Sequence, residues 1–224
     1  MERVGIVMPA YQTECEIAGV IAVCAAIDGI VGIVVIDDGS TDGTGTVARE
    51  SGVTVLVHPE NRGKGAALLT GFAHASSKGW DAVITIDADG QHDPAEIPAF
   101  IERYREHRED IIIGTRTRGS GMPFARRLSN RISSLMVSRI SGVRVDDSQS
   151  GYRLITRSVW EKLTLTCRSY DMESEMLIRA GRAGFQIGQV PIPTTYAGET
   201  SHFRAWKDTV RIADLFLRMY LLEA

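Results

Sequence analysis

Cysteine is scarce in this chain, and its few copies are poorly placed for a disulfide framework or a metal site. The 224 residues include three cysteines, an odd number, at Cys15, Cys24 and Cys167. Their spacing matches no metal-binding pattern, and the first two fall within one predicted helix. Structural disulfides belong to oxidising compartments, so this cysteine content favours a reducing cytosol.

A secretory signal and a long hydrophobic run are also missing. The run MERVGIVMPAY enters a predicted strand at once, without a basic region, an apolar core or a small-residue cleavage site. The segment from Gly19 to Ile36 is almost wholly apolar. It is interrupted by Asp28, Gly29 and Gly32, so a helix followed by a buried strand explains it better than a membrane span. We therefore expect a cytoplasmic protein.

Acidic residues are missing from one long stretch. The formal net charge of −3 and the pI of about 6.0 argue against a protein that binds nucleic acid with its whole surface. Residues 115–144, however, contain no Asp or Glu. Their basic residues are Arg116, Arg118, Arg126, Arg127, Arg131, Arg139 and Arg144. Such a stretch suits phosphate groups.

Short β-branched runs alternate with helical patterns along the first half of the chain. The strand-like runs there are VGIVM, GIVVI, VTVLV and DAVITI, and later ones are DIIIG, SGYRLIT and FQIGQVPI. Continuous apolar strands separated by amphipathic helices are typical of a parallel sheet that is covered on both faces. At 224 residues one domain is a normal outcome. We predict a single α/β domain with a doubly wound, mostly parallel sheet and helices on both faces.

Polar residues follow the predicted strands at the edge where such sheets bind ligands. The first strand leads into Pro9 and Tyr11, and the second into the run DDGS from Asp37. The fourth leads into Asp87 and Asp89, whose i, i+2 spacing in an extended segment points both carboxylates the same way. Two such carboxylates can share a hard divalent cation, which suggests a site for a metal and a diphosphate. The alternative is a pair of acidic residues that merely ends a strand.

Two glycine-rich segments open predicted helices. In IDDGSTDGT, residues 36–44, an aspartate can bind a nucleobase edge or a ribose hydroxyl, or the run can be an ordinary turn and helix cap. In ENRGKGAAL, residues 60–68, Lys64 lies between two glycines, but the spacing is not that of a phosphate-binding P-loop or of GxGxxG. A role at the start of a helix is therefore expected for this second segment. His58, His74 and His107 have no ligand spacing and are expected on loop or helix surfaces.

An arginine-rich helix is predicted from about residue 123 to residue 140. Its spacing predicts an inward stripe of Phe124, Leu128, Ile132, Leu135 and Ile140. A second face, which can meet an anion, is predicted to carry Arg127, Arg131, Ser134 and Ser138.

Eight motifs follow one another in a familiar order. They are VMPAYQTECEI, IDDGSTDGT, ENRGKGAAL, IDADGQHDP, GTR, RRLSNRISS, DSQSGYRL and ESEMLIRAGRAGFQIGQVPI. This order resembles the family 2 glycosyltransferases of the dolichol-phosphate mannosyltransferase type over nearly the whole chain. The resemblance implies a fold of the GT-A type, a nucleotide sugar linked to GDP or UDP, Mg²⁺ or Mn²⁺, and a polyprenyl-phosphate acceptor. It divides the domain 1–224 into a nucleotide-sugar-binding half (1–115), an acceptor half (116–202) and a C-terminal amphipathic helix (203–224).

The resemblance also implies roles for individual positions. The residues expected to act in catalysis are Asp87, Asp89 and Arg116, and the metal ligands are Asp87, Asp89 and Gln91. The expected nucleotide-binding residues are Pro9, Tyr11, Glu14, Asp38 and Ala88. The acceptor phosphate is expected to contact Arg126, Arg127, Arg131 and Arg204.

The chain departs from the family pattern at three places, one of which is a late arginine of the family that has no clear counterpart near Thr194. Gln12-Thr13 stands where Asn-Glu is usual, so a nucleoside contact passes to Glu14 or is lost. His202 stands where a lysine is usual, and Arg204 or Lys207 would have to supply that charge. These departures keep open a second reading, a nucleotide-sugar-binding regulatory protein without turnover.

The chemistry of a phosphate acceptor favours transfer without a catalytic base. A phosphate monoester, with a second pKa near 6, is already largely anionic at neutral pH. In-line attack from the face opposite the leaving diphosphate would invert the anomeric centre. An alternative acceptor, a saccharide or protein hydroxyl, would need a base such as Glu173 or Glu175, although Glu175 is also spaced to pair with Arg179.

The C-terminal run RAWKDTVRIADLFLRMYLLEA is amphipathic and cationic. Such a helix suits a peripheral contact with the inner face of a membrane, which would bring a lipid-borne acceptor to the site. Packing on the body of the enzyme, or on a second subunit of a homo-oligomer, is the alternative.

Overall fold

The structure is a computed structural model that describes residues 2–116, 124–169, 171–193 and 214–219, with the backbone alone at 124–126. Its centre is a seven-stranded sheet in the order β3-β2-β1-β4-β6-β5-β7. The strands are β1 (Val4–Ala10), β2 (Ile30–Asp37), β3 (Thr54–Val57), β4 (Ala82–Thr85), β5 (Ile111–Arg116), β6 (Arg153–Thr156) and β7 (Ile187–Ile192). All seven coincide with the strand-like runs of the sequence.

The helices also occur where the patterns predict them. They are α1 (Ile17–Ala25), α2 (Thr44–Glu50), α3 (Lys64–Ser77), α4 (Ile97–His107), α5 (Phe124–Ser141), α6 (Arg157–Lys162) and α7 (Met172–Arg182). A 3-10 turn, η1 (Pro94–Glu96), precedes α4, where Asp93 accepts a hydrogen bond from the backbone N–H of Ala95 at 2.9 Å. Such a cap together with a proline at the first position is a common way to begin a helix.

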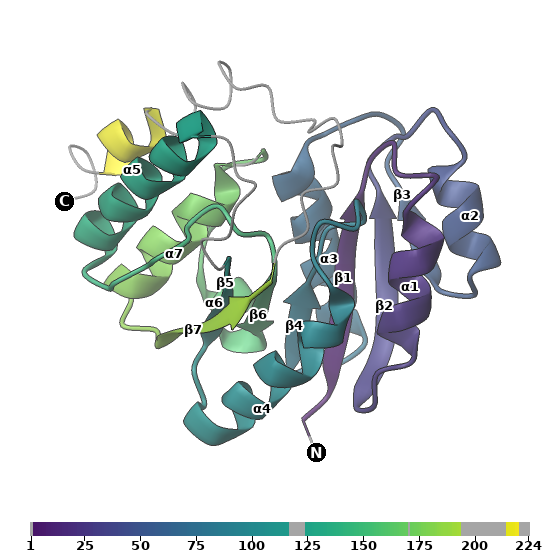
Figure 1. The fold of residues 1–224 in the computed structure, drawn as a ribbon, viewed down its shortest axis with the longest axis horizontal. Coiled ribbons are helices and arrows are strands. Elements are labelled where there is room, and N and C mark those ends of the chain that lie inside the picture. Colours follow the sequence, from purple (N-terminus) through teal and green to yellow (C-terminus); the bar gives the residue numbers. More distant parts are fainter. Residues whose placement is uncertain (1, 117–123, 170, 194–213, 220–224) are drawn as a thin grey trace.

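The sheet buries apolar side chains on both faces, because successive residues of a strand point to opposite sides. Val7 of β1 packs with α3, α5, α6 and α7 on one face. Its neighbours Ile6 and Met8 pack with α1, α2 and α4 on the other. Figure 1 shows the first half of the chain in purple and blue on the right and the later half in green on the left. The predicted doubly wound, mostly parallel sheet is confirmed.

One strand runs against the others, which the sequence patterns did not reveal. β6 pairs antiparallel with β4 on one side and with β5 on the other, whereas the remaining pairs are parallel. Arg153, the first residue of β6, lies opposite Thr85, the last residue of β4. The reversal therefore delivers the SGYR segment to the edge at which β1, β2, β4 and β5 end.

The short helical piece at residues 214–219 packs on the body of the protein. Its apolar residues Leu215, Phe216 and Met219 are buried in the same cluster as Val137 and Ile140 of α5. The rest of the predicted C-terminal helix lies outside the described residues. Within the described ranges, no helix combines the length and apolar character that crossing a bilayer requires.

The tight packing of Trp80 against β1 gives a prediction about stability. A Cβ added at Gly5 of β1 would overlap the buried ring of Trp80, whereas one added at Gly19 of α1 would meet nothing. Gly5→Ala is expected to lower the free energy of unfolding by about 1–3 kcal/mol through overpacking. The matched change Gly19→Ala is expected to raise it by up to about 1 kcal/mol, since alanine favours a helix. Urea unfolding measures both, and equal effects of the same sign would contradict this packing.

Candidate active site

Charged residues gather where the strands end. Tyr11 follows β1, Asp38 follows β2, Asp87 follows β4, and Arg116 ends β5. The start of β6 reaches the same edge from the opposite direction, at Arg153. The strand order also reverses between β1 and β4, since the chain goes on from β1 to β2 on one side and from β4 to β5 on the other. Such a reversal is the usual place for a ligand in these folds.

The acidic pair lies in a turn beyond its strand. β4 ends at Thr85, so Asp87 and Asp89 are not in the extended segment that the sequence predicted. Gly90, with φ of 71°, adopts the left-handed conformation that this turn needs. The carboxylate of Asp89 accepts a hydrogen bond from the backbone N–H of Gln91 at 3.0 Å. The turn, rather than the pleat of a strand, therefore sets the directions of both carboxylates.

A lysine lies against the first acidic residue. The ammonium nitrogen of Lys64 is 2.7 Å from Oδ1 of Asp87 and 3.0 Å from Oε1 of Glu173. A Cβ at Gly151 would collide with all three charged groups, so this glycine makes room for the cluster. Burial acts to raise the pKa of Asp87, but the charges of Lys64 and of Arg116 outweigh it and hold the pKa below its usual value. Asp87 is therefore an anion that already has a cation beside it.

Arg116 is held in place by a buried carboxylate. Its Nε and Nη2 donate to the two oxygens of Asp147 at 2.7 and 2.8 Å, a bidentate geometry that fixes the guanidinium plane. Asn130 of α5 donates to the same carboxylate at 3.0 Å. Burial raises the pKa of Asp147, yet the hydrogen bonds and charge of Arg116 bring it below its usual value. Asp147, to which the sequence reasoning assigned no role, thus links β5, α5 and the segment before β6.

A second arginine anchors the SGYR segment from within the core. Arg153 is 1% exposed. It donates to the backbone carbonyl oxygens of Ser150 at 2.7 Å, Glu173 at 2.8 Å and Ser148 at 2.8 Å. Burial lowers its pKa, and the nearby charges of Glu173, Asp147 and Asp87 oppose that effect. No pattern in the sequence distinguishes this buried arginine from an exposed one.

The turn and the SGYR segment also meet through aromatic rings. His92 is buried, and its ring centroid lies 5.4 Å from that of Tyr152, whose hydroxyl donates to the carbonyl oxygen of Asp93 at 3.2 Å. Burial, with the charges of Arg116 and Lys64, lowers the pKa of His92 to about 4, so the ring is neutral at pH 7. His92 is therefore a packing residue of this loop.

Asp38 orders the segment that carries Lys64. It is 3% exposed, and its carboxylate accepts bonds from His58 at 2.6 Å, the N–H of Arg62 at 3.0 Å and the N–H of Gly63 at 2.8 Å. The expected surface position of His58 is wrong: the residue is buried because Asp38 and Thr70 bind its two ring nitrogens. A nucleoside contact of Asp38 remains a prediction.

The expected nucleotide-binding residues of β1 and its loop lie beside the segment after β2. Gln12 has a φ of 57°, and its side-chain oxygen accepts bonds from the N–H groups of Thr41 and Asp42, both at 3.2 Å. Glu14 accepts a bond from the N–H of Gly43 at 3.0 Å. Pro9 is buried in β1, opposite Ile36, and Tyr11 is half-buried. Ala88 is buried in the turn between the two aspartates.

The predicted inward stripe of α5 is confirmed at Ile140, which is buried, and is wrong for its other described members. Leu128, Ile132 and Leu135, expected inside, are 47%, 54% and 67% exposed. Ser134, expected on the anion-binding face, is buried and donates to Ser148 at 3.3 Å. Part of the inner face meets the polar loop around Ser148, where hydroxyl groups find partners, and part meets the apolar core through Val137 and Ile140.

The four acceptor arginines fall in different places. Arg127 and Arg131 are exposed on α5. Arg126 lies on α5 with its side chain outside the described residues, and Arg204 lies wholly outside them, as does His202. The structure therefore brings Arg116 into the charged cluster, whereas Arg127 and Arg131 stand on an outer face.

The two glutamates of DMESEML have separate environments. Glu173 faces Lys64 in the cluster, as described above. Glu175 is fully buried and accepts hydrogen bonds from the N–H of Cys167 at 2.8 Å, Thr166 Oγ1 at 2.7 Å and Arg179 Nε at 2.9 Å. The predicted pairing with Arg179 is confirmed, and these bonds leave Glu175 unsuited to act as a base.

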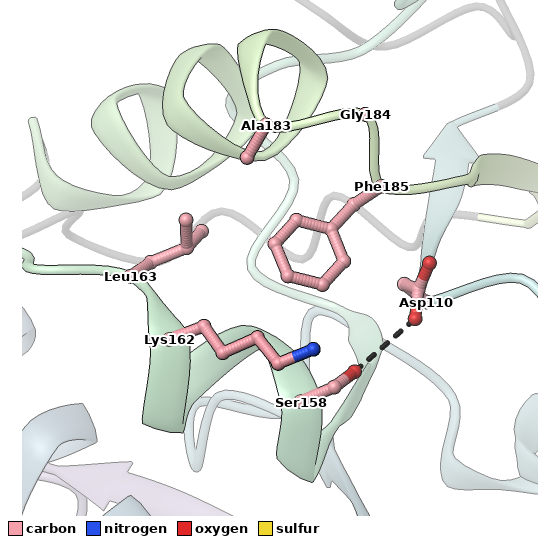
Figure 2. A pocket seen from close by; sticks show the side chains of 7 residues that line it. All are labelled: Asp110, Ser158, Lys162, Leu163, Ala183, Gly184 and Phe185. Atoms are coloured by element: carbon pink, nitrogen blue, oxygen red, sulfur yellow. Dashed lines mark hydrogen bonds between the residues drawn. The ribbon is translucent and has the colours of Figure 1, made fainter.

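A hollow of about 390 Å³ lies at the other end of the sheet (Figure 2). It is lined by Asp110, Ser158, Lys162, Leu163, Ala183, Gly184 and Phe185. Asp110 precedes β5, about 20 Å of extended chain from Arg116. Its carboxylate accepts bonds from Ser158 at 3.2 Å and from the N–H of Gln186 at 2.9 Å, so it ties chain segments together. The carboxyl edge, where opposite charges converge, is therefore the candidate active site.

Comparison with known proteins identifies the family. The model of the family described as glycosyl transferase family 2 matches residues 5–167. An uncharacterised protein of Methanocaldococcus jannaschii is 33% identical over 87% of this chain and 82% of its own length. The UDP-N-acetylglucosamine–dolichyl-phosphate N-acetylglucosaminyltransferase of Methanococcus voltae is 30% identical over 97% and 95%. The polyprenol monophosphomannose synthase of Mycolicibacterium smegmatis is 29% identical over 87% and 78%.

Solved structures agree on the fold. Glucosyl-3-phosphoglycerate synthase from Mycobacterium tuberculosis, in complex with Mn²⁺ and UDP-glucose, has a TM-score of 0.77 and 24% identity over 97% of this chain and 78% of that one. The same enzyme with Mg²⁺ and UDP has a TM-score of 0.75 and 22% identity over 98% and 78%. The chain belongs to glycosyl transferase family 2 and is a glycosyltransferase.

The buried bonds of Glu175 give a pH-dependent prediction. Burial acts to raise the pKa of Glu175, but the hydrogen bonds of Cys167, Thr166 and Arg179 lower it below its usual 4.5. Its contribution to stability is therefore complete above about pH 4.5 and is lost as the pH falls through the lower folded-state pKa. Glu175→Gln is expected to lower the free energy of unfolding by about 1–3 kcal/mol at pH 7 and to flatten its decline in acid.

The control is Glu161→Gln, which removes an exposed carboxylate 3.6 Å from Arg157 and should change stability little. Urea unfolding at a series of pH values measures all three proteins. Parallel acid profiles for the wild type and Glu175→Gln would contradict the assignment.

Proposed function

We propose that this glycosyltransferase moves a hexose from a GDP- or UDP-linked nucleotide sugar to a polyprenyl phosphate, with inversion and with help from a divalent metal. The observation that carries the proposal is the cluster at the carboxyl edge, where Lys64 pairs with Asp87, and Arg116, held by Asp147, adds its positive charge near the same carboxylate. Two relatives whose names specify dolichyl phosphate or a polyprenol support the acceptor class.

The acidic turn suits Mg²⁺ or Mn²⁺. Asp87 and Asp89 would be its carboxylate ligands, with Gln91 beside them. Among the described residues no group of three His, Cys, Asp or Glu side chains forms a metal site, so the phosphates of the substrate would have to complete the coordination. Magnesium is commonly bound by one or two carboxylates together with substrate phosphates. The ammonium of Lys64 against Asp87 supports this fit, since it places a positive charge at the same carboxylate. When bound, the metal would stabilise negative charge on the leaving diphosphate.

The loops after β1 and β2 are the proposed nucleoside site. Pro9, Tyr11 and Glu14 come from the first strand and its loop, Asp38 from the second, and Ala88 from the turn after β4. The bonds that join Gln12 and Glu14 to the 41–43 segment support a shared, preformed site. Such a preformed loop lowers the ordering cost of binding.

The acceptor would be held by arginine. The acceptor phosphate oxygen would attack the anomeric carbon as the bond to the β-phosphate oxygen breaks, and the nucleoside diphosphate would leave with the electron pair. A base is dispensable, because this phosphate is already ionised at neutral pH. Arg116, Arg126, Arg127, Arg131 and Arg204 are the proposed contacts, and acceptor and enzyme would meet at the cytoplasmic face of the membrane.

A hydroxyl acceptor is the second candidate, and one observation favours it. The carboxylate of Glu173 is 3.0 Å from Lys64 in the same cluster as Asp87, where a base would be needed. Glu175 is no longer a candidate for this base, because its oxygens are already hydrogen-bonded. Extraction of the labelled product into organic solvent separates the two candidates, because only a lipid product partitions there.

Asp89→Asn tests the proposed metal site. Asparagine keeps an oxygen that can accept the bond from Gln91 but loses the charge, so we expect a fall in sugar transfer of about 100-fold or more with little change in stability. The assay is transfer of labelled sugar from GDP- and UDP-sugars to a short polyprenyl phosphate, with and without chelator. Asp28→Asn, in the loop between α1 and β2, is the matched control and should keep full activity. Full activity of Asp89→Asn that chelator does not change would contradict the proposed metal site.

Lys64→Met tests whether the lysine competes with metal for Asp87. Removing a positive charge 2.7 Å from the carboxylate should tighten Mn²⁺ binding without nucleotide by roughly tenfold. It should weaken binding of the nucleoside diphosphate, since a positive charge near the phosphates is lost. Titration followed by electron paramagnetic resonance measures free Mn²⁺ directly, and Lys78→Met at the other end of α3 is the control. Unchanged Mn²⁺ affinity would mean that Lys64 does not compete.

A further inference from the structure

The outer face of α5 is an apolar stripe bordered by arginines. Leu128, Ile132 and Leu135 are spaced by four and three residues, so they lie on one side of the helix. They are 47%, 54% and 67% exposed, which is unusual for aliphatic side chains repeated along one face. Arg139, four residues beyond Leu135, continues the same line and is exposed. We call these four residues and the exposed Arg127 and Arg131 the outer face of α5.

All the charged residues on the outer face of α5 are positive. From residue 127 to the end of α5, the exposed residues are these three aliphatic side chains and three arginines. The whole helix has no Asp or Glu, and neither does the longer stretch 115–144. A helix with an apolar stripe and arginines on its border is typical of helices that lie in a membrane interface. Arginines near an anionic leaflet add electrostatic attraction.

The inner face of the same helix is fastened to the active site. Ser133 shares a 2.9 Å hydrogen bond with Ser148, and Asn130 donates to Asp147, which holds Arg116. Figure 1 shows α5 running along α7 on the outside of the green half of the molecule. Whatever the outer face binds is therefore held next to the segment that positions Arg116.

We propose that the outer face of α5 docks on an anionic lipid surface, and this inference rests on the proposed lipid-phosphate acceptor. The docked helix would hold the Arg116–Asp147 pair beside the bilayer, where the phosphate of a polyprenyl acceptor is found. Arg127 and Arg131 would then meet phosphates at the level of the lipid headgroups.

A second copy of the chain suits this face poorly. A symmetric dimer through it would bring arginines against arginines, and like charges across an interface oppose association. The stripe is also a single row of three side chains, whereas a stable protein interface buries about 800 Å² per partner. Charge complementarity thus favours lipid over a twin subunit.

Vesicle binding of the full chain tests the proposal. Sedimentation is measured with vesicles of phosphatidylcholine alone and with vesicles of equal parts phosphatidylcholine and phosphatidylglycerol. The test variant is Leu128→Gln/Ile132→Gln/Leu135→Gln. The matched control is Val23→Gln/Val31→Gln/Val57→Gln, which changes three side chains that are 43–49% exposed in α1, β2 and β3. Arg139→Gln, a single exposed change, tests the charge without the risk of misfolding.

We expect the wild type and the control to bind anionic vesicles, and more weakly at high salt because salt screens charge. The test variant should lose about tenfold in binding, and Arg139→Gln should lose less. Transfer to a short, water-soluble polyprenyl phosphate should be unchanged in the test variant, because its three side chains are outside the active site.

Equal vesicle binding by the wild type and the test variant would overturn the inference, as would failure of the wild type to bind anionic vesicles. A wild-type dimer that the test variant converts to a monomer, with vesicle binding unaltered, would assign the face to a second copy instead. Failure of the proposed function has a different signature: no transfer to any polyprenyl phosphate by a wild type that still binds vesicles.

Discussion

The contact between Lys64 and the carboxylates of Asp87 and Glu173 is the interaction on which the rest of the site depends. Strands β1, β2, β4 and β5 end at this edge, and their loops bring acidic groups into partly buried space. A carboxylate moved out of water becomes harder to ionise unless a positive charge accompanies it. Lys64 provides that charge at 2.7 and 3.0 Å. The position of Lys64 is set in turn by Asp38, whose carboxylate accepts hydrogen bonds from the N–H groups of Arg62 and Gly63, the two residues before Lys64. The absence of a side chain at Gly151 leaves the space that the cluster occupies.

The reversed strand β6 explains how distant motifs meet. An antiparallel strand between β4 and β5 begins at the edge where those strands end, so the segment before it enters the site. Arg153 then secures this segment through three backbone carbonyl groups, one of them on α7. A buried guanidinium needs hydrogen-bond partners, and these carbonyl groups supply them. Asp147 and Arg116 form a second link in the same place. The site is therefore assembled from both halves of the chain by buried charge pairs rather than by one continuous loop.

Helix α5 contacts the candidate active site with one face and is exposed on the other. Serines and an asparagine of its inner face meet a polar loop, and Val137 and Ile140 meet the apolar core. Leu128, Ile132 and Leu135 face outward, so the predicted inward stripe was right for Ile140 and wrong for these three. The helical period of the apolar residues alone indicates that a helix has two faces, but only the segments that pack against the helix decide which face is covered. The exposed stripe and its arginines belong to the same helix that contacts Asp147, the partner of Arg116. The outer surface and the candidate site are therefore parts of one packed unit.

Local patterns in the sequence were enough to predict the strands, most of the helices and the mostly parallel sheet, because each depends on residues that are near one another in the chain. The family was indicated by the order of eight motifs over nearly the whole chain. The motifs also located the edge at which charges gather. The direction of β6, the burial of His58 and the pairing of Arg116 with Asp147 were decided only by the tertiary structure. Each depends on a partner about 20 or more residues away or on a neighbouring strand, and no periodicity encodes such a contact. Burial and charge compensation are properties of the assembled chain.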